Sequence, residues 1–461
     1  MATPVSIVIL AAGLGTRMKS RKAKVLHRAG GKTLVEHVVA TSLELAPAER
    51  VFVVVGHQAE DVRQAVPGVR FIEQTEQKGT GHAVLAGREA LQGLGGCLVI
   101  LYGDCPLLQA ATLRHLIAQT ESGDAAGTLL TARMDDPTGY GRVIRDARGR
   151  VAAIVEQKAA NAEQLAIREA NMGIYCFRAE PFWKHAGEIH PNNAAREYYL
   201  TDMVEILNRH GHFLEGIEVE DAREVLGINN RVELAEVDRL FRERKLRELM
   251  LGGVTIEKPE TVTVDLGVTI GIDTVVEPFA QILGGTTIGE DCRIGACAII
   301  RDSALGNEVE IGPFTVVGAS RVERGAVVGP FSRLRFGNRV GEKAHVGNFV
   351  ELKNAELGAG AKANHLAYLG DTEIGAGANI GAGTITCNYD GFRKHRTKIG
   401  DGVFVGSNAT LVAPLEISGG AYVAAGSVIT EAVPPEALAL GRSRQVVKPD
   451  WARKRRALAK K

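Results

Sequence analysis

A glycine-rich segment follows the first apolar run of the chain and has the residue types of a phosphate-binding loop. It reads LAAGLGTRM over 10–18, and further cations follow at Lys19, Arg21, Lys22 and Lys24. Small residues let backbone N–H groups approach phosphate oxygens, and the cations, Arg17 included, supply the charge that a triphosphate requires. The segment lacks the end of a Walker loop and the third glycine of a dinucleotide fingerprint, and a lone Gly-x-Gly also suits a tight strand-to-helix turn. By itself it leaves both interpretations open.

A carboxylate stands at a similar place later in the chain. Asp104 follows Tyr102 and Gly103, directly after the apolar run 97–101. In an α/β sheet the carboxyl end of such a strand faces the ligand crevice, and a carboxylate there can hold Mg²⁺ for phosphoryl chemistry. The alternative is a helix or turn cap. The candidate phosphate loop upstream favours the metal interpretation.

A second group of chemically capable residues interrupts a regular repeat in the C-terminal half. The position after each repeated aliphatic residue is normally glycine or small, but it becomes Arg335, Lys353 and Asn364 in three repeats, and His365 follows. A long cation beside a turn of the coil cannot enter the interior, so we expect it to project outward, where a ligand can reach it. A lone histidine is more often structural than catalytic, so spacing alone leaves the role of His365 open.

The repeat itself predicts the fold that carries this second group. From about Ile270 to Ile429 an aliphatic residue followed by glycine or a small residue returns at every sixth position. Neither a helix nor an alternating strand has this period, whereas a hexapeptide β-helix stacks one short strand per repeat with the aliphatic side chains inside. The segment CNYDGFRKHRTK between Thr386 and Ile399 breaks the period and predicts a polar, basic loop that leaves the prism. The positions that keep the period are Ile288, Ile294, Ile300, Leu305, Ile311, Val317, Val328, Leu334, Val340, Val346, Leu352, Ile399, Val405, Leu411, Ile417, Val423 and Ile429, with further runs over 357–369 and 374–386.

The N-terminal half instead alternates strand and helix patterns. This alternation predicts an α/β domain with a doubly wound, Rossmann-like sheet, whose ligands bind beyond the carboxyl ends of the strands. The apolar runs lie at 5–10, 51–55, 97–102, 127–131, 151–155 and 172–177, and the helical patterns at 33–46, 80–93 and 110–120.

Between the halves, a helical pattern predicts a connecting helix. It is indicated by Leu234, Val237, Leu240 and Phe241 at helical spacing, by Asn230 and Glu233 in capping-box positions and by a stop at Gly252-Gly253. We therefore expect an α/β domain over 1–228, the helix over 229–252, the repeat domain over 253–446 and a basic tail, WARKRRALAKK at its end, over 447–461. We expect the tail to be a solvated end.

Composition limits the class of protein. With 461 residues, 45% hydrophobic, 24% charged and a formal net charge of +1, the chain has the composition of a multidomain soluble protein and shows no sign of nucleic-acid binding. No apolar run reaches the roughly 20 residues of a membrane helix, and the chain begins without a basic leader, so we expect no membrane insertion and a cytosolic location. The six cysteines have no metal-binding spacing and are expected to be packing residues in a reducing compartment.

The ordered motifs give the chain a resemblance to a known family. The N-terminal set resembles the sugar nucleotidyltransferases, and together with the C-terminal set it resembles the bacterial bifunctional N-acetylglucosamine-1-phosphate uridyltransferase and glucosamine-1-phosphate N-acetyltransferase family over nearly the whole chain. The motifs are LAAGLGTRM, AKVLH (23–27), EQKGTGHA (76–83), LYGD (101–104), PTGYGRV (137–143), VEQK (155–158), EANMGIY (169–175), EYYLTD (197–202), GINNR (227–231), HVGNFVELK (345–353), NHLAYLGD (364–371) and GAGTITCNYDG (381–391).

The resemblance implies a metal-assisted attack of a sugar-1-phosphate oxygen on the α-phosphorus of UTP, which yields UDP-N-acetylglucosamine and pyrophosphate. It implies Mg²⁺ as the metal, held by Asp104 and Asn229. It also implies a uridylyl site in which Leu10, Ala11, Ala12, Gly13, Gln74, Gly79, Thr80, Tyr102 and Gly103 surround the nucleotide, Arg17 and Lys24 contact phosphates, and Gly141, Glu156 and Asn171 hold the sugar. For Asn229 a turn or cap, and for Glu156 a solvated strand end, are the structural alternatives.

For the repeat domain the resemblance implies acetylation of glucosamine-1-phosphate by acetyl-coenzyme A in a left-handed β-helix that forms a homotrimer. This chemistry requires a base for the amine proton, cations for the phosphate and donors for the thioester oxyanion. His365 suits the base because an imidazole keeps a neutral fraction near pH 7. The resemblance assigns Arg335 and Lys353 to the phosphate, Tyr368 and Asn379 to the sugar, and Ala382, Asn388, Tyr389, Ser407, Ala425 and Arg442 to the acetyl-coenzyme A side of the site.

Two positions depart from the family pattern, since Ala23 and Phe336 stand where proline is usual. Proline would fix φ, so both replacements are expected to loosen their loops, and Arg335 is expected to shift slightly.

Two other functional classes also remain: a single-activity nucleotidyltransferase whose β-helix only oligomerises or regulates, and a non-catalytic subunit. The intact loop with Asp104 argues against the second, and His365 with its cationic neighbours argues against the first.

Overall fold

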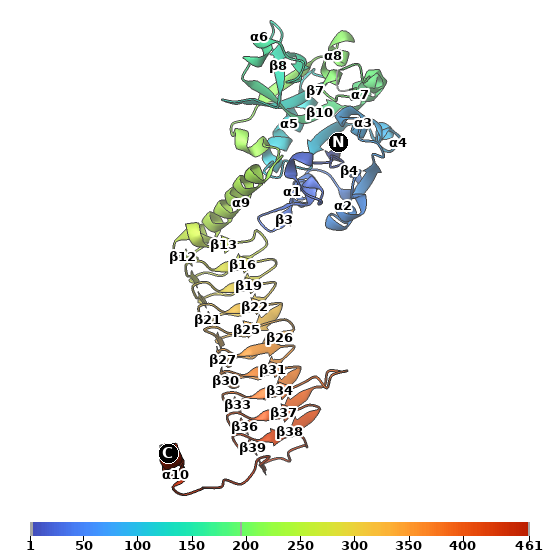
Figure 1. Cartoon of the computed structure of the whole chain (residues 1–461). Helices are drawn as coiled ribbons and strands as arrows, with labels where there is room; N and C mark the ends of the chain where they lie inside the picture. Colours follow the sequence, from blue (N-terminus) through green and yellow to red (C-terminus); the bar gives the residue numbers. More distant parts are fainter. Residues whose placement is uncertain (1–2, 194–195, 460–461) are drawn as a thin grey trace. The chain divides into compact units, whose positions relative to one another are not determined.

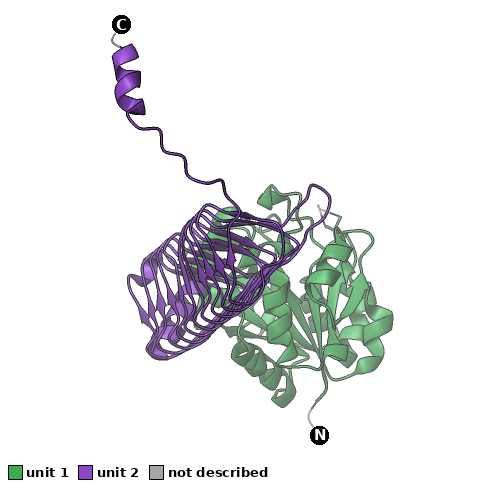
Figure 2. Ribbon diagram, turned by 90° about the horizontal axis from the view of Figure 1, so that it is seen from below, with its two compact units in different colours: residues 1–241 green, residues 242–461 purple. Residues whose placement is uncertain are grey.

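The computed structural model describes residues 3–193 and 196–459 and divides into two compact units, 1–241 and 242–461 (Figure 2). The first unit is built on one mixed sheet (Figure 1), and the second on three long parallel sheets. The boundary between the units falls within the helix α9 (Arg231–Leu251). Among the described residues, no helix is both long and apolar enough to cross a membrane.

The sheet of the first unit has nine strands, four of them parallel neighbours at one side. The strands predicted at 5–10, 51–55, 97–102 and 151–155 are confirmed with the same bounds. In sheet order they are β5 (Arg70–Glu73), β4 (Val51–Val55), β1 (Val5–Leu10), β6 (Cys97–Tyr102), β10 (Glu169–Arg178), β7 (Gly127–Arg133), β11 (Leu214–Glu218), β9 (Val151–Val155) and β8 (Gly141–Arg145). The sequence analysis missed β5, β8 and β11 because each mixes charged and apolar residues instead of forming an apolar run.

Helices cover both faces of this sheet, and the sheet separates two apolar cores. The predicted helix over 80–93 is wrong as one element, because the chain breaks at Gly87 into two short helices and a 3₁₀ turn. The helices are α1 (Leu34–Leu43), α2 (Ala59–Ala65), α3 (Thr80–Leu85), α4 (Arg88–Leu91), α5 (Ala110–Ser122), α6 (Ala162–Leu165), α7 (Ala179–His185) and α8 (Asp202–Arg209), and a small hairpin joins β2 (Arg28–Ala29) to β3 (Lys32–Thr33).

The helix α9 follows the predicted capping only in part. Asn230 Oδ1 accepts from the backbone N–H groups of Val232 (2.9 Å) and Glu233 (3.0 Å). The Glu233 carboxylate accepts instead from the N–H of Asn229 at 2.6 Å, so the reciprocal bond is made one residue earlier than a capping box requires. The helix ends at Leu251, and Gly253 shortly after it has a φ of +94°, a conformation that favours glycine.

The second unit is the predicted left-handed parallel β-helix, with one strand per hexapeptide (Figure 1). The repeated aliphatic positions from Ile288 to Ile429 are buried in one continuous core. From β12 to β37 each strand pairs in register with the strand three positions on, and β39 pairs with β41, so equivalent positions stack from coil to coil. This stacking turns a six-residue sequence period into columns of side chains along each face.

The β-helix has three sheets, called the first, second and third in chain order. The first contains β12 (Thr255–Ile256), β15 (Val275–Val276), β18 (Arg293–Ile294), β21 (Glu310–Ile311), β24 (Val327–Val328), β27 (His345–Asn348), β30 (Lys362–His365), β33 (Asn379–Ile380), β36 (Phe404–Val405), β39 (Tyr422–Val423) and β41 (Leu438–Ala439). The second contains β13 (Thr263–Val264), β16 (Gln281–Leu283), β19 (Ile299–Arg301), β22 (Val316–Gly318), β25 (Arg333–Leu334), β28 (Glu351–Lys353), β31 (Tyr368–Gly370), β34 (Ile385–Cys387), β37 (Thr410–Val412) and β40 (Val428–Ile429). The third contains β14 (Thr269–Ile270), β17 (Thr287–Ile288), β20 (Ala304–Leu305), β23 (Ser320–Val322), β26 (Asn338–Val340), β29 (Glu356–Leu357), β32 (Thr372–Ile374), β35 (Thr397–Ile399) and β38 (Leu415–Ile417).

Between the last strand and residue 459 the described chain is exposed, except for the half-buried Gly441. It ends in a short helix, α10 (Trp451–Leu458), whose residues are all exposed. The six cysteines are free, and four of them are buried. Burial without a disulfide agrees with packing roles for those four.

Candidate active sites

The phosphate-loop candidate and Asp104 lie side by side because β1 and β6 are parallel neighbours. Leu10 pairs in register with Tyr102, so the residues after both strands emerge at the same edge of the sheet. Gly103 does not line the site. Its N–H donates to the carbonyl oxygen of Leu10 at 3.0 Å, and a Cβ atom there would lie 3.3 Å from Ala11 Cβ. Gly103 therefore packs the loop against the strand.

A cavity of about 430 Å³ opens over the glycine-rich loop. Its lining includes most of the residues that the resemblance assigns to the nucleotide. It also includes Gln77 and Glu197, which the sequence analysis missed. Gly79, at φ +105°, must be glycine because a Cβ atom would lie 2.6 Å from the carbonyl oxygen of Tyr198. The predicted residues in this lining are Leu10, Ala11, Ala12, Gly13, Lys24, Gln74, Gly79, Thr80, Tyr102 and Asp104.

A second cavity, of about 290 Å³, shares Tyr102 and Asp104 with the first. Burial raises the pKa of the Glu156 carboxyl, which also accepts a hydrogen bond from Thr201 Oγ1 at 3.3 Å. The predicted residues in its lining are Arg17, Tyr102, Asp104, Gly141, Glu156, Asn171 and Asn229, and the residues that the sequence analysis missed include Thr138, Tyr140, Gly173 and Glu233.

Gly173 shapes this second cavity through Tyr102. Its φ is +73°, and a Cβ atom would lie 2.3 Å from the Tyr102 ring. Tyr102 lines both cavities, so Gly173 makes room for the ring that separates them. The glycine lies within the EANMGIY motif, but its positive φ and this contact are visible only in the fold.

Asp104 and Asn229 present oxygen atoms to the same cation. The Lys24 ammonium forms an ion pair with the Asp104 carboxylate and donates to Asn229 Oδ1 at 3.3 Å. Arg17 also donates to Asn229 Oδ1, at 2.8 Å. A carboxylate and an amide oxygen that converge on one positive centre are the donor types that Mg²⁺ prefers, so these two residues fit the metal.

Ala23, which precedes Lys24 and stands where proline is usual in the family, is held by a hydrogen bond. Its φ is −54°, within the range that proline would impose, and its N–H donates to Gln58 Oε1 at 2.6 Å. A proline could not make this hydrogen bond. Gln58 thus supplies a restraint at Ala23 that a proline could not have.

In the β-helix, His365 ends β30 and is exposed. Its Nδ1 lies 2.8 Å from Asn348 Oδ1 on the preceding coil. An amide oxygen can only accept, so Nδ1 carries the proton in the neutral ring and Nε2 keeps its lone pair. The sequence analysis missed Asn348, which stands in the HVGNFVELK motif without a signal of its own.

Arg335 and Lys353 lie at successive positions of one column on the second sheet, but only Arg335 is accessible. Arg335 forms an ion pair with Glu351 at 3.3 Å, and its guanidinium carbon lies 5.9 Å from the centre of the Phe336 ring. The Lys353 ammonium lies 5.8 Å from the same ring. The phenylalanine that replaces the usual proline thus offers its face to both cations.

The expectation that Lys353 projects into solvent is wrong. The side chain points away from the prism, yet it is only 7% exposed because side chains of the following coils cover it. Its ammonium forms an ion pair with Asp371 at 3.3 Å, and Asp371 also accepts from Asn354 and Asn388. Burial alone would raise the pKa of Asp371, but these donors outweigh it and hold the pKa below the usual value.

Five of the remaining acetyl-site candidates occupy three places on the β-helix. Ala382, Ser407 and Ala425 belong to stacked corners, where Asn408 donates to the carbonyl oxygen of Ala382 (2.7 Å) and Gly426 to that of Ser407 (2.8 Å). Tyr368 lies on the second sheet, and Asn379 lies on the first, in register with Lys362 and Phe404.

The predicted loop after Thr386 contains Asn388, which is buried, and Tyr389, which is 60% exposed. Arg442 lies beyond the last strand and is exposed.

The comparisons with known proteins agree with this two-part architecture. The family profile of a MobA-like NTP transferase domain matches residues 7–168, and that of the bacterial transferase hexapeptide matches residues 267–302. Full-length relatives named bifunctional protein GlmU occur in Solibacter usitatus (68% identical, 100% of this chain and 99% of the relative), Koribacter versatilis (50%, 99% and 98%) and Anaeromyxobacter dehalogenans (52%, 99% and 94%). Identity at this level over both domains shows that the chain belongs to the bifunctional GlmU family, which combines N-acetylglucosamine-1-phosphate uridylyltransferase and glucosamine-1-phosphate acetyltransferase activities.

Proposed function

We propose that the two adjoining cavities of the first unit bind the two substrates of uridylyl transfer, UTP over the glycine-rich loop and N-acetylglucosamine-1-phosphate in the second cavity. In this reaction a sugar-phosphate oxygen forms a bond to the α-phosphorus of UTP as the bond to pyrophosphate breaks. The observation that carries the assignment is that Asp104 and Tyr102 line both cavities. The reacting groups would meet at that shared wall.

The residues around the shared wall suit positioning and charge neutralisation, which carry phosphoryl-transfer chemistry. We assign the backbone of Leu10–Gly13 to the nucleotide, Lys24 and Arg17 to its phosphates, and Glu156 and Asn171 to the sugar. Asp104 and Asn229 would hold Mg²⁺, which when bound neutralises charge on the phosphate oxygens. Lys24 bridges both residues in the single chain, so the ammonium can turn to a phosphate when the metal takes its place.

We assign the acetyltransferase reaction to the corner of the β-helix around His365. The amine nitrogen of glucosamine-1-phosphate forms a bond to the acetyl carbon, the thioester C–S bond breaks, and His365 Nε2 accepts the amine proton. The coenzyme A thiolate leaves and takes up a proton from solvent. Arg335 would bind the phosphate, and Lys353 would join it when its ammonium leaves Asp371. Tyr368 and Asn379 would bind the sugar, and Ala382, Ser407, Ala425 and Arg442 would bind acetyl-coenzyme A.

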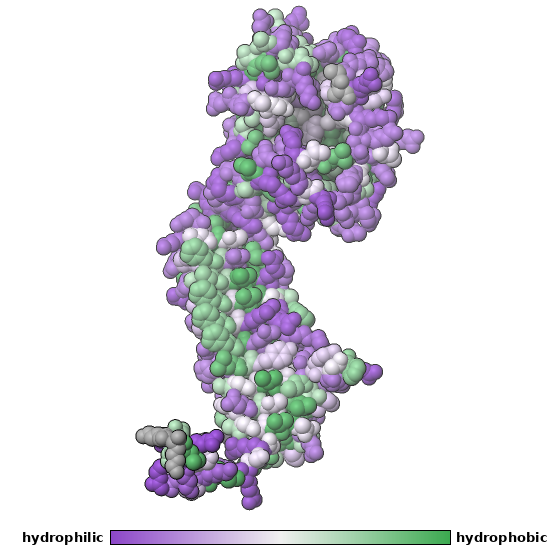
Figure 3. Space-filling view, in the orientation of Figure 1, coloured by the Kyte–Doolittle hydropathy of each residue, from purple (hydrophilic) through white to green (hydrophobic). Residues whose placement is uncertain are grey.

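A homotrimer would complete this site, with Asn388 and Tyr389 entering it between subunits. An exposed apolar row supports association of the repeat domain. Its members occupy turns with positive φ, and all but Phe279 lie on successive coils. Apolar side chains also form a band along the β-helix in Figure 3. The rings of Phe314, Phe331 and Phe349 stack at 5.2 and 5.4 Å. The row is Phe279, Phe314, Phe331, Phe349 and Leu366, each 47–62% exposed.

We also propose the domain limits 1–228, 229–252, 253–446 and 447–461 and a cytoplasmic location, where UTP and acetyl-coenzyme A are made. A fragment over 242–461 retains Leu246 and Leu249, which belong to the β-helix core, and should form the trimer by itself. Analytical ultracentrifugation of this fragment and of Phe331→Ser tests the row. A monomeric fragment, or unchanged association of the variant, would count against the proposal.

Asp104→Asn tests the division of labour between the units. The substitution removes the negative charge that the metal requires but keeps the shape of the side chain, so uridylyl transfer should fall to background while acetyl transfer continues at the wild-type rate. Pyrophosphate release and thiol release report the two reactions separately. Comparable loss of both activities in a folded trimer would contradict the assignment.

A further inference from the structure

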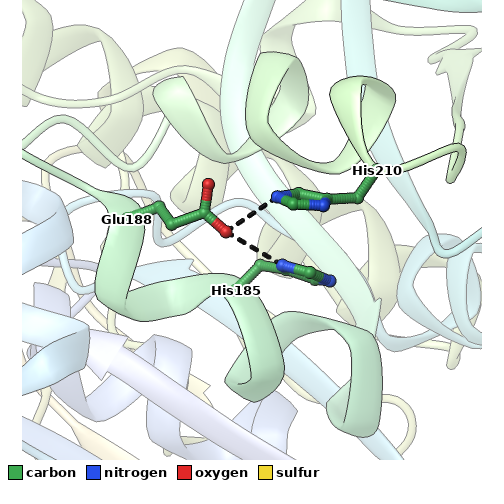
Figure 4. A group of neighbouring side chains, drawn as sticks. All are labelled: His185, Glu188 and His210. Atoms are coloured by element: carbon green, nitrogen blue, oxygen red, sulfur yellow. Dashed lines mark hydrogen bonds and ion pairs between the residues drawn. The ribbon is translucent and has the colours of Figure 1, made fainter.

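Three metal-ligating side chains converge at a place that the two reactions do not use. His185 is the last residue of α7, Glu188 ends the 3₁₀ turn η5 (Ala186–Glu188), and His210 directly follows α8. Figure 4 shows the two imidazoles turned toward the same carboxylate. One nitrogen or oxygen of each residue lies within 4.8 Å of those of the other two. In the described chain, none of the three lines the two cavities of the uridylyl site.

The geometry of the group is that of converging donors. His185 Nδ1 lies 2.9 Å and His210 Nε2 2.8 Å from the same oxygen, Glu188 Oε1. The two rings are stacked, with centroids 3.8 Å apart and planes 22° apart. His185 is buried, with 9% of its side chain exposed, so packing already fixes the direction of its nitrogen. Glu188 and His210 are each 40% exposed, which leaves an open side toward solvent.

We propose that His185, Glu188 and His210 bind one Zn²⁺ ion or a similar borderline transition-metal ion. Two imidazole nitrogens and one carboxylate oxygen form a common zinc donor set, and solvent would supply the fourth ligand on the open side. Zinc–ligand bonds of about 2.0–2.2 Å are shorter than the present N···O contacts, so the ion would enter between the three side chains as the carboxylate retreats. The site differs from the Mg²⁺ site, because Mg²⁺ prefers oxygen donors in an octahedral arrangement.

Metal binding here would join two helices. α7 and α8 pack against each other, and the group ties the end of one to the end of the other. The residue before α8, Thr201, donates to Glu156 in the second cavity of the uridylyl site. Because only the folded chain brings the three donors together, Zn²⁺ should raise the unfolding temperature of the enzyme. The alternative is a purely structural hydrogen-bonded group without metal affinity.

The test uses the full-length protein after removal of metal with EDTA. Zn²⁺ is titrated in competition with a chromophoric chelator, against the wild type, Glu188→Gln and His210→Ala. The matched control is His190→Ala, which removes an exposed histidine from the same segment but outside the group. The wild type and the control should bind one Zn²⁺ per chain with equal affinity. Each of the two variants should bind at least tenfold more weakly, since even indirect partners of a metal site change affinity by about 10–100-fold.

A second readout identifies the coordination. Co²⁺ added in place of Zn²⁺ should give the visible absorption of a four-coordinate site in the wild type and in His190→Ala, and lose it in His210→Ala. His210 is partly exposed, so this variant should keep its circular dichroism and its metal-free unfolding temperature. Equal Zn²⁺ affinity in all four proteins, or no binding by the wild type, would overturn the proposal and leave a hydrogen-bonded group only.

Discussion

His365→Ala separates a catalytic histidine from a structural one. If His365 Nε2 accepts the amine proton, its loss should reduce acetyl transfer about 10²- to 10⁴-fold, the usual range for a positioned acid–base group. At about 1.36 kcal/mol for each factor of ten, the activation barrier rises by about 2.7 to 5.4 kcal/mol. His365 is exposed, so the free energy of unfolding should change by no more than about 0.5 kcal/mol. If His365 is structural instead, acetyl transfer per folded enzyme should change little and the free energy of unfolding should fall clearly.

The hydrogen bond to Asn348 adds a graded test. Asn348 Oδ1 accepts the Nδ1 proton of His365 and so keeps the proton on that nitrogen. In Asn348→Ala the ring stays in place, but its proton can sit on either nitrogen. Acetyl transfer should fall about fivefold, which corresponds to one hydrogen bond of about 1 kcal/mol. His345→Ala, on the neighbouring strand β27 of the same sheet, serves as the matched control and should retain the wild-type rate.

The assay is thiol release from acetyl-coenzyme A with glucosamine-1-phosphate, under conditions that also permit pyrophosphate release to be measured. Ultracentrifugation checks that each variant assembles as the wild type does. All variants should retain uridylyl transfer, because the substitutions lie in the other unit. A correctly assembled His365→Ala enzyme that acetylates at nearly the wild-type rate would refute the assignment of the base and transfer the role to another group or to water.

Three further substitutions test the packing around the two sites. Asp371→Ala leaves the ammonium of Lys353 buried without its carboxylate, so the β-helix should lose about 3 kcal/mol in denaturant unfolding; a loss below about 1 kcal/mol would mean that the pair is solvated. Burial and two neighbouring carboxylates raise the pKa of Asp202 to about 6, so from about pH 4 to 6 the folded state keeps a proton that the unfolded state has released, and stability falls as pH rises. Asp202→Asn should therefore gain about 1 kcal/mol relative to wild type between pH 4 and pH 8, after allowance for partial exposure, and a pH-independent difference would contradict this. Gly173→Ala should push the Tyr102 ring into the cavities, destabilise the first unit by about 1–3 kcal/mol and lower uridylyl but not acetyl transfer; full uridylyl activity would show that the ring can move freely.

Local patterns predicted most of the architecture. The six-residue period identified the β-helix because one strand per repeat buries one aliphatic side chain, and each of those positions is buried. The apolar strands β1, β4, β6 and β9 were equally clear. By contrast, β5 and β8 lie at the edges of the sheet and mix charged with apolar residues, so no apolar run marks them. The break of one predicted helix at Gly87 also depends on packing, since a Cβ atom there would lie 2.5 Å from Ile72.

For the two candidate active sites, too, some features were predictable from the sequence and others only from the fold. By itself the sequence determined which residue types follow β1 and β6, where the hexapeptide rule fails, and which family has this order of motifs, because these features are read along the chain. Only the tertiary structure decided that Asp104 and Tyr102 join two cavities, that Asn348 orients His365, that Lys353 is covered by Asp371, and that His185, Glu188 and His210 share one oxygen. Each of these contacts joins residues on different elements, and the packing of those elements determines distance and burial, which no local spacing encodes.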